Sequence, residues 1–169
     1  SYGLLAEALR HVPDGWHLEI AGDGPARTQV EDLFRPFGDR VAFLGQGDAA
    51  MLGALYRRSD LMVWPGVNEA FGMAYLEAAA SGCPSLAMAY GGVGEVVADG
   101  ESGHLVTAGD TAAYAQTLSQ LLSRPARLAA LGRGAAQLAR RRHDIQAAAS
   151  LVSDCLQRFV GHGSRSCVS

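Results

Sequence analysis

The sequence contains no lysine, so all fourteen of its basic residues are arginine. Cysteine is also scarce: Cys83, Cys155 and Cys167 are odd in number and lie at none of the spacings typical of a metal site. This scarcity disfavours a disulfide framework and favours a reducing, cytoplasmic setting. No apolar run approaches the ~18 residues that a membrane span requires, and the first segment lacks the pattern of a signal peptide.

The composition is that of a soluble globular protein, with 49% apolar and 18% charged residues. A length of 169 residues suits a single core. The net charge of -3 argues against a nucleic-acid-binding surface, so no nucleic-acid partner is expected. The chain starts without methionine and inside a helix-like pattern, YGLLAEALRHV, so we expect a fragment of a longer protein.

Short apolar segments alternate with longer segments of helical periodicity. Five segments have the pattern of strands: 16–21, 40–45, 60–65, 84–89 and 103–106. Between and after them, helices are predicted over 26–37, 49–59, 72–81, 111–123, 125–142 and 144–159. The run at 60–65 is continuously apolar, which is typical of a strand buried on both faces.

This alternation predicts an α/β fold, with right-handed βαβ units and one parallel sheet covered by helices on both faces. Ligands of such sheets bind at the carboxyl ends of the strands. The glycine turns GDGP, GQGD and YGGVGE each follow a predicted strand. We therefore expect them to gather along one edge of the sheet, where the functional site should lie.

The segment NEAFGMAYLEAAASGCP places Glu69 where a helix should begin and Glu77 about two turns along it. The first N–H groups of a helix lack internal partners and lie at the positive end of its dipole, and Gly72 has no side chain to keep a ligand away. This helix start is a candidate phosphate site. The two carboxylates could then accept hydrogen bonds from hydroxyl groups on either side, which suits a nucleotide-sugar.

Ordinary interpretations of these features stay open. Two helical glutamates eight positions apart are common; Glu69 could simply favour the helix dipole, and Glu77 could be solvated. The GDGP turn could simply end a strand, because G-x-G alone is a weak nucleotide signal. Gly91, Gly92 and Glu95 repeat the arrangement of glycine turn, helix start and carboxylate, and a role in lining the site is favoured over a simple loop.

Several motifs stand in the same order as in the retaining GT-B glycosyltransferases of family 4, also called glycosyl transferases group 1: EIAGDGP, RVAFLGQ, LYRRSDLMVWP, the E-x7-E segment EAFGMAYLE, GGVGEVVADGESGHLV and GDTAAYAQTLSQLL. The resemblance runs nearly end to end. It implies one half of a GT-B architecture, a Rossmann-like three-layer α/β/α domain that binds the sugar donor. Residues 1–160 would form this C-terminal-type nucleotide-sugar-binding domain with its first strand missing, and 161–169 would be a disordered tail.

The resemblance also implies roles for residues around the helix start. Glu69 would be the catalytic residue and would hold hydroxyl groups of the donor sugar. The backbone amides of Phe71, Gly72 and Met73 would lie near the sugar and diphosphate. Glu77 would accept hydrogen bonds from the ribose hydroxyls.

Two glycine turns would complete the donor site. Gly22 and Gly24 would let the backbone pass close to the diphosphate, and Gly91 and Gly92 would lie near the donor sugar. The segment 41–46 would border the base. The implied reaction is transfer of a sugar from a nucleoside-diphosphate sugar to an acceptor with retained anomeric configuration, and the acceptor would lie mainly on an N-terminal domain that this sequence lacks.

The chain departs from the family in its basic residues. The family supplies an arginine and a lysine that grip the diphosphate, and alignment places that lysine just before Ser1. We therefore expect the isolated chain to bind a nucleotide-sugar weakly and not to transfer the sugar. No D-x-D occurs, so neither a metal nor another cofactor is expected.

Other functions compete with this prediction. A sugar-nucleotide epimerase of the same architecture would bind a similar donor, and a non-catalytic nucleotide-binding or interaction module could share the fold. A dinucleotide-dependent dehydrogenase is disfavoured because the complete glycine fingerprint is absent. The run at 140–142 is either a basic helix end, which is favoured, or a contact with an anionic membrane, so peripheral membrane association of the full-length enzyme stays open.

Overall fold

The structure is a computed structural model that describes residues 1–142. Along the chain the elements are α1 (Tyr2–Leu9), β1 (Leu18–Ala21), α2 (Arg27–Phe34), the 3₁₀ segment η1 (Arg35–Arg40), β2 (Val41–Gly45), α3 (Ala49–Arg58), β3 (Met62–Val63), α4 (Met73–Ala80), β4 (Ser85–Met88), α5 (Val93–Val96), β5 (Gly103–Val106), α6 (Thr111–Leu122) and α7 (Pro125–Arg142). The predicted helix 144–159 and the predicted tail 161–169 lie outside the described residues.

All strand pairs among the described residues are parallel, as predicted. β1 pairs with β2, and β4 lies between β3 and β5. The predicted single sheet is nevertheless divided, because no ladder joins β1 to β3 within residues 1–142. A second prediction also differs from the structure. The strand expected over 60–65 is only two residues long, and its side chains are half-buried rather than buried.

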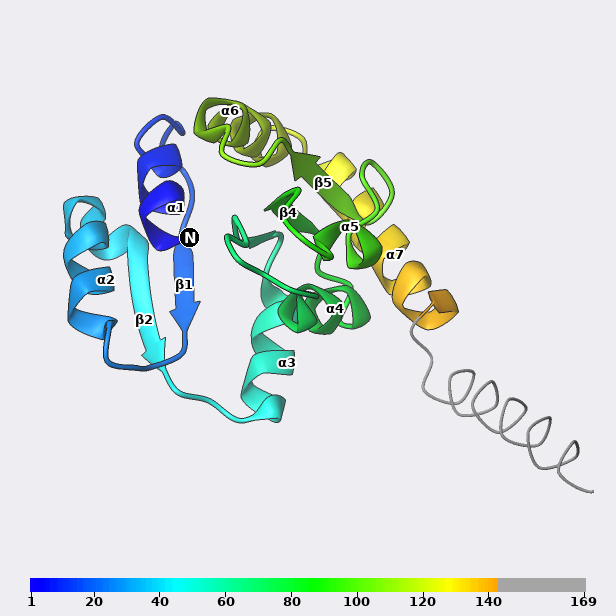
Figure 1. The fold of residues 1–169 in the computed structure, drawn as a ribbon, viewed down its shortest axis with the longest axis horizontal. Coiled ribbons are helices and arrows are strands. Elements are labelled where there is room, and N and C mark those ends of the chain that lie inside the picture. The colour runs from blue at the N-terminus through cyan, green and yellow to red at the C-terminus, as the bar shows by residue number, and fades with distance from the viewer. Residues whose placement is uncertain (143–169) are drawn as a thin grey trace, which may run out of the picture.

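Helices cover both half-sheets. α1 packs against α2 and α6, and α4 packs against α3 and α7. Figure 1 shows α1 and α2 beside β1 and β2, and α4, α5 and α7 around β4 and β5. These layers confirm the predicted α/β class. The glycine turns directly follow the carboxyl ends of the strands.

The main core joins the two half-sheets through α1 and α6. Leu5 and Leu9 of α1 pack in one cluster with Ile20 of β1 and Leu86 of β4. Tyr114 of α6 is fully buried in the same cluster, and its hydroxyl donates a hydrogen bond to the Leu86 carbonyl at 2.9 Å. Burial in this apolar core raises the pKa of Tyr114. The halves are therefore fixed to each other by helix packing rather than by strand pairing.

Local signals in the sequence explain several boundaries. Asp48 caps α3 by accepting from the Met51 amide at 2.8 Å, as predicted. Asp110 caps α6 in the same way, through the Ala113 amide at 2.9 Å. The helix predicted over 26–37 is wrong at its end: α2 stops at Phe34, and Pro36 lies in the 3₁₀ segment that follows.

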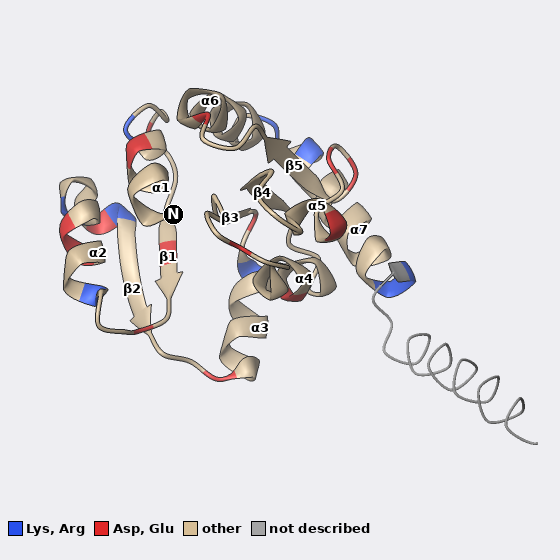
Figure 2. Ribbon diagram, in the orientation of Figure 1, with Lys and Arg blue, Asp and Glu red and all other residues tan. Residues whose placement is uncertain are grey.

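Charged residues of both signs are spread over the described elements rather than gathered by sign, as Figure 2 shows. Within residues 1–142 no helix is both long enough and apolar enough to cross a membrane.

Candidate functional site

The loop between β3 and α4 is folded around one buried aromatic ring. Tyr75 is 1% exposed, and its hydroxyl donates to the Trp64 carbonyl at 2.8 Å. A Cβ atom at Gly72 would lie 2.5 Å from Cδ2 of Tyr75, and one at Gly66 would overlap its hydroxyl. Both glycines have positive φ, 72° at Gly66 and 87° at Gly72. The sequence of this loop therefore depends on glycine at the two places where the backbone crosses the ring.

Glu69 lies at the start of α4, as predicted. Its Oε1 atom accepts a hydrogen bond from the backbone N–H of Gly72 at 3.1 Å. Gly72 is the N-cap of the helix and is buried, while Glu69 is half-buried. A carboxylate at this position is stabilised by the helix dipole. It also occupies one of the donors that a phosphate at the helix start would use.

The Gly91–Gly92 turn is packed directly on the backbone of this loop. The Gly92 N–H donates to the Ala70 carbonyl at 3.1 Å. A Cβ atom at Gly92 would lie 2.6 Å from that carbonyl oxygen, and one at Gly91 would overlap the carbonyl oxygen of Glu69. The structure thus brings Glu69, Gly91 and Gly92 together, and it explains both glycines by the close approach of two backbones.

The remaining predicted residues, in α4 and just before it, lie on the surface. Phe71 is 43% exposed and Met73 is 56% exposed, beside the buried cap at Gly72. Glu77 is exposed one turn after Met73. Burial raises the pKa of Tyr56 on α3, and the charge of Glu77 raises it further, which places Glu77 on the side of α4 that faces α3.

Gly22 and Gly24 form a separate turn at the carboxyl end of β1. Gly22 has a φ of 129°, and its N–H donates to the Gly45 carbonyl at 2.7 Å. The Gly24 N–H donates to a carboxylate oxygen of Asp23, also at 2.7 Å. Both glycines line a cavity of about 180 Å³ that also contacts Phe43 of β2, within the segment expected to border a base.

Arg27 lines the same cavity and was not predicted as a site residue. Its Nη1 lies 3.2 Å from Asp23, and its Nε lies 2.8 Å from Glu31. The hydrogen bond with Glu31, followed by the charge of Asp23, raises the pKa of Arg27. A guanidinium in the first turn of a helix is unfavourable because it lies at the positive end of the helix dipole. An arginine at this position, directly after a glycine turn, is therefore a feature of the sequence that points to an anionic partner.

Ser1 and Tyr2 connect the loop before α4 with the cavity at Gly22. Ser1 Oγ accepts from the Val67 amide at 2.9 Å, just beyond the carboxyl end of β3. The Tyr2 ring contacts the Trp64 ring at a centroid distance of 4.8 Å and also lines the cavity beside Gly22. The cluster around Glu69 and the cavity at Gly22 are therefore neighbours, linked by the start of α1.

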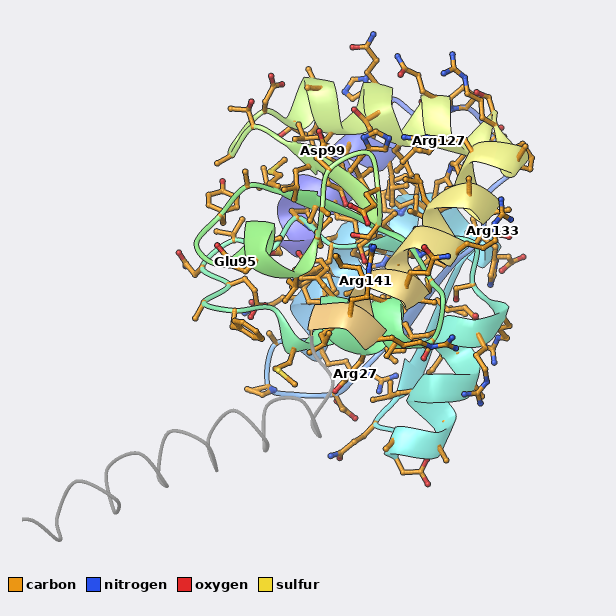
Figure 3. All side chains as sticks on the ribbon, turned by 90° about the vertical axis from the view of Figure 1, so that its right-hand side faces the viewer. Arg27, Glu95, Asp99, Arg127, Arg133 and Arg141 are labelled. Atoms are coloured by element: carbon orange, nitrogen blue, oxygen red, sulfur yellow. The ribbon has the colours of Figure 1, made fainter. Side chains whose placement is uncertain are left out.

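Two arginines of α7 form hydrogen bonds with the turn that precedes β5. Arg127 donates to the Gly100 carbonyl at 2.9 Å, and Arg141 donates to Glu101 at 2.6 Å. Figure 3 shows Arg127, Arg133 and Arg141 along α7. Within residues 1–142 no three His, Cys, Asp or Glu side chains are grouped as metal ligands; His104 pairs instead with Asp99 at 3.0 Å.

Solved structures share this fold. A sucrose-phosphate synthase from Thermosynechococcus elongatus matches with a TM-score of 0.84 and 29% identity over 95% of this chain and 42% of that one. HepE from Anabaena, solved in complex with UDP, matches with a TM-score of 0.82 and 24% identity over 92% of this chain and 44% of that one. These structural neighbours are GT-B glycosyltransferases, and this chain shares their α/β fold over part of their length.

The chain belongs to the family described as glycosyl transferases group 1, whose profile matches residues 2–124. A D-inositol 3-phosphate glycosyltransferase from Salinispora tropica is 46% identical over 123 residues, which cover 71% of this chain and 26% of the relative. A protein of the same name from Mycolicibacterium smegmatis is 38% identical over 141 residues, 79% of this chain and 32% of the relative. The chain therefore spans about a quarter to a third of the length of these two relatives.

Proposed function

We propose that this chain is the donor-binding domain of a retaining, metal-independent glycosyltransferase that transfers a sugar from a nucleoside-diphosphate sugar to an acceptor. The observation that carries the proposal is the Glu69 carboxylate on the Gly72 amide, with the Gly91–Gly92 turn packed against the same loop. The names of the curated relatives support the reaction class. The Anabaena structures, solved with UDP and with UDP-glucose, support the class of donor.

The proposed binding step is an exchange of partners at the start of α4. In the free protein Glu69 holds the Gly72 N–H. A diphosphate that arrives at the helix start takes over this donor, because a helix N-terminus favours a negative charge. The released carboxylate is then free to accept hydrogen bonds from hydroxyls of the donor sugar. Amides at Phe71 and Met73 complete the contact with the sugar and diphosphate.

The other roles follow from position. The exposed Glu77 accepts hydrogen bonds from the ribose hydroxyls. Gly22 and Gly24 border the diphosphate at the cavity beside the carboxyl end of β1. During transfer, negative charge grows on the departing diphosphate, and oriented amides stabilise it without reorganisation. Metal independence is part of the proposal because the sequence offers no D-x-D. The acceptor-binding domain, a cytoplasmic location and any peripheral membrane contact belong to the longer chain.

Thermal-shift titration of the 169-residue chain with UDP, GDP, ADP and their glucose and mannose derivatives tests donor binding. We expect one nucleotide series to raise the melting temperature, and the sugar-bearing form to bind more tightly than the diphosphate alone. Glu69→Gln should abolish the difference between the two forms. Glu7→Gln on α1, an exposed glutamate remote from the loop, is the matched control and should preserve it.

Two results would contradict the proposal. The absence of a melting-temperature shift with every nucleotide would contradict donor binding. An unchanged preference for the sugar-bearing form in Glu69→Gln would contradict the proposed role of Glu69. The isolated chain should show no sugar transfer to acceptor or water, because the acceptor half is absent; robust turnover would contradict that expectation.

A further inference from the structure

The hydroxyl group of Tyr75 replaces a ladder hydrogen bond where β3 ends. Trp64, directly after β3, donates its N–H to the Leu86 carbonyl of β4 at 3.1 Å. In a regular parallel pair the Trp64 carbonyl would accept from the same neighbouring strand. It accepts instead from the Tyr75 hydroxyl at 2.8 Å, while the Met88 N–H of β4 donates to the Pro65 carbonyl at 3.2 Å. Tyr75 therefore ends the regular ladder at the residue from which the loop before α4 departs.

The same side chain supports the loop that carries Glu69. A Cβ atom at Gly66 would overlap the Tyr75 hydroxyl and would lie 3.7 Å from Cβ of Glu69. The Gly66 carbonyl accepts a hydrogen bond from the Glu69 N–H at 3.0 Å. Glu69 in turn holds the Gly72 N–H, and the Gly72 carbonyl accepts from the Tyr75 N–H at 3.0 Å. These contacts form a closed path that begins and ends at Tyr75.

The loop needs such support because its backbone is unusual. Asn68 has a φ of 64° and is the only residue other than glycine with a positive φ within residues 1–142. A backbone of this kind persists where the surrounding structure fixes it. Tyr75 supplies a fixed surface, because it is 1% exposed and lies beneath the loop at both Gly66 and Gly72.

The Tyr75 hydroxyl remains a donor close to a carboxylate. Burial raises the pKa of Tyr75, and the negative charge of Glu69 raises this pKa further. The phenol is therefore neutral around neutral pH and keeps its proton for the Trp64 carbonyl. Its support of the loop does not depend on pH in that range.

We propose that Tyr75 is a positioning residue for the donor site. Its hydroxyl, bound to the Trp64 carbonyl, holds the loop at 65–72. The Glu69 carboxylate is thereby kept at the start of α4. Tyr75 does not touch the donor, because it is buried beneath the loop. It acts through Glu69 on recognition of the sugar of a nucleoside-diphosphate sugar, a role that rests on the proposed function.

Tyr114 provides a matched control in the same core. It is fully buried on α6, and its hydroxyl donates to the Leu86 carbonyl at 2.9 Å. Leu86 lies inside β4, whereas the carbonyl held by Tyr75 lies at the start of the loop. Tyr114→Phe and Tyr75→Phe therefore each remove one buried hydroxyl that donates to a carbonyl of the sheet. Only the second of these bonds leads to Glu69.

Hydrogen exchange of the free chain, measured by NMR, tests the positioning. Both variants should melt roughly 2–6 °C below the parent, because each loses one buried hydrogen bond. In Tyr75→Phe the Gly72 amide should exchange about tenfold faster relative to the amides of β4, because the loop opens locally. In Tyr114→Phe this relative rate should equal that of the parent.

Calorimetry tests the consequence for the donor. The probes are the diphosphate and its glucose derivative from the series, UDP, GDP or ADP, that stabilises the parent most. We expect Tyr75→Phe to reduce the preference for the sugar-bearing form at least about threefold. Tyr114→Phe should keep the preference of the parent. A merely structural role would leave this ratio of affinities alike in the two folded variants.

Each contrary outcome has a distinct meaning. Equal relative exchange rates at Gly72 in the two variants would overturn the positioning. A Tyr75→Phe chain that does not fold would also overturn it, because the effect of the hydroxyl would then extend beyond the loop. Faster exchange with an unchanged sugar preference would overturn the role in donor recognition. If the parent binds no nucleotide, the proposed function fails, whereas the exchange experiment still decides whether Tyr75 positions Glu69.

Discussion

The carboxylate of Glu69 accepts a hydrogen bond from the backbone N–H of Gly72, 3.1 Å away, at the start of α4. The same residue supplies the carbonyl against which Gly91 is packed. Its side chain therefore satisfies the helix start while its backbone supports the second glycine turn. A ligand that takes the Gly72 amide changes the partner of Glu69 without having to move the turn.

Replacement of Glu69 should destabilise the free domain. In Glu69→Ala the Gly72 amide loses its acceptor and the helix loses a favourable charge, so the free energy of unfolding should fall by about 1 kcal/mol. Urea denaturation at neutral pH measures this change. Glu7→Ala, which removes an exposed carboxylate of α1, should change stability by less than about 0.5 kcal/mol. Equal losses in both variants would show that the bond at Gly72 contributes nothing.

The Gly91 backbone should not tolerate a side chain. Gly91 has a φ of 48°, and an added Cβ would overlap the Glu69 carbonyl, so Gly91→Ala should lower the free energy of unfolding by about 1–3 kcal/mol. Gly3→Ala in α1 is the matched control, since an added Cβ meets no atom within 4 Å there. The control should be neutral or stabilising by up to about 1 kcal/mol. A Gly91→Ala domain as stable as the parent would refute the close approach.

Cys83 should make stability fall at alkaline pH. Burial raises the pKa of this thiol from 9.0 to about 12. Its contribution is therefore complete below pH 9 and is lost as the pH rises toward 12, because the unfolded chain releases this proton first. The loss should be about 1.4 kcal/mol per pH unit in that window.

Cys83→Ala separates this effect from the tyrosines. The variant is expected to be less stable at neutral pH, because a buried sulfur is removed, but its stability should fall less steeply between pH 9 and pH 10. Above pH 10 both proteins should lose stability further, since burial also raises the pKa of Tyr75 and Tyr114. Urea denaturation at several pH values provides the slopes, and identical slopes from pH 9 to 10 would contradict the assignment.

Arg27 should contribute to the binding of a diphosphate. It lines the cavity at Gly22 and Gly24, and a guanidinium there can reach an anion by exchanging one of its two carboxylate partners. We expect Arg27→Gln to weaken the binding of the preferred nucleoside diphosphate about threefold to tenfold, measured by calorimetry at low salt. Arg35→Gln removes an exposed arginine one element further along and should leave the affinity unchanged. Equal affinities for the parent and Arg27→Gln would exclude the role.

Local signals predicted much of the fold. The strand at 103–106 has the predicted bounds, the helix predicted from residue 125 begins there, and Asp48 caps its helix. Capping residues, prolines and apolar periodicity act within a few positions of each boundary, so these features can be inferred from sequence. The apolar run at 60–65 did not predict the division of the sheet, because a strand pattern does not record which neighbours the strand pairs with.

The proximity of two predicted segments could be inferred from the sequence, whereas the hydrogen bonds between their atoms could not. The motif around Glu69 and the turn at Gly91 suggested a shared location, and the structure brings them together. The hydrogen bond from Gly72 to the Glu69 side chain depends on a rotamer, which no spacing encodes. Arg27 stands beside a glycine turn in the sequence, but its place in the wall of the cavity depends on tertiary packing, which the sequence pattern does not encode.

The buried ring of Tyr75 has a consequence for how this loop can diversify. Gly66 and Gly72 are fixed because they cross the ring, whereas Ala70 and Phe71 between them point to the exterior. Substitutions at the two outer positions can reshape the rim of the site without shifting the backbone that carries Glu69. Related domains can therefore evolve new ligand preferences on an anchored frame, and a designer who varies only Ala70 and Phe71 should obtain folded libraries.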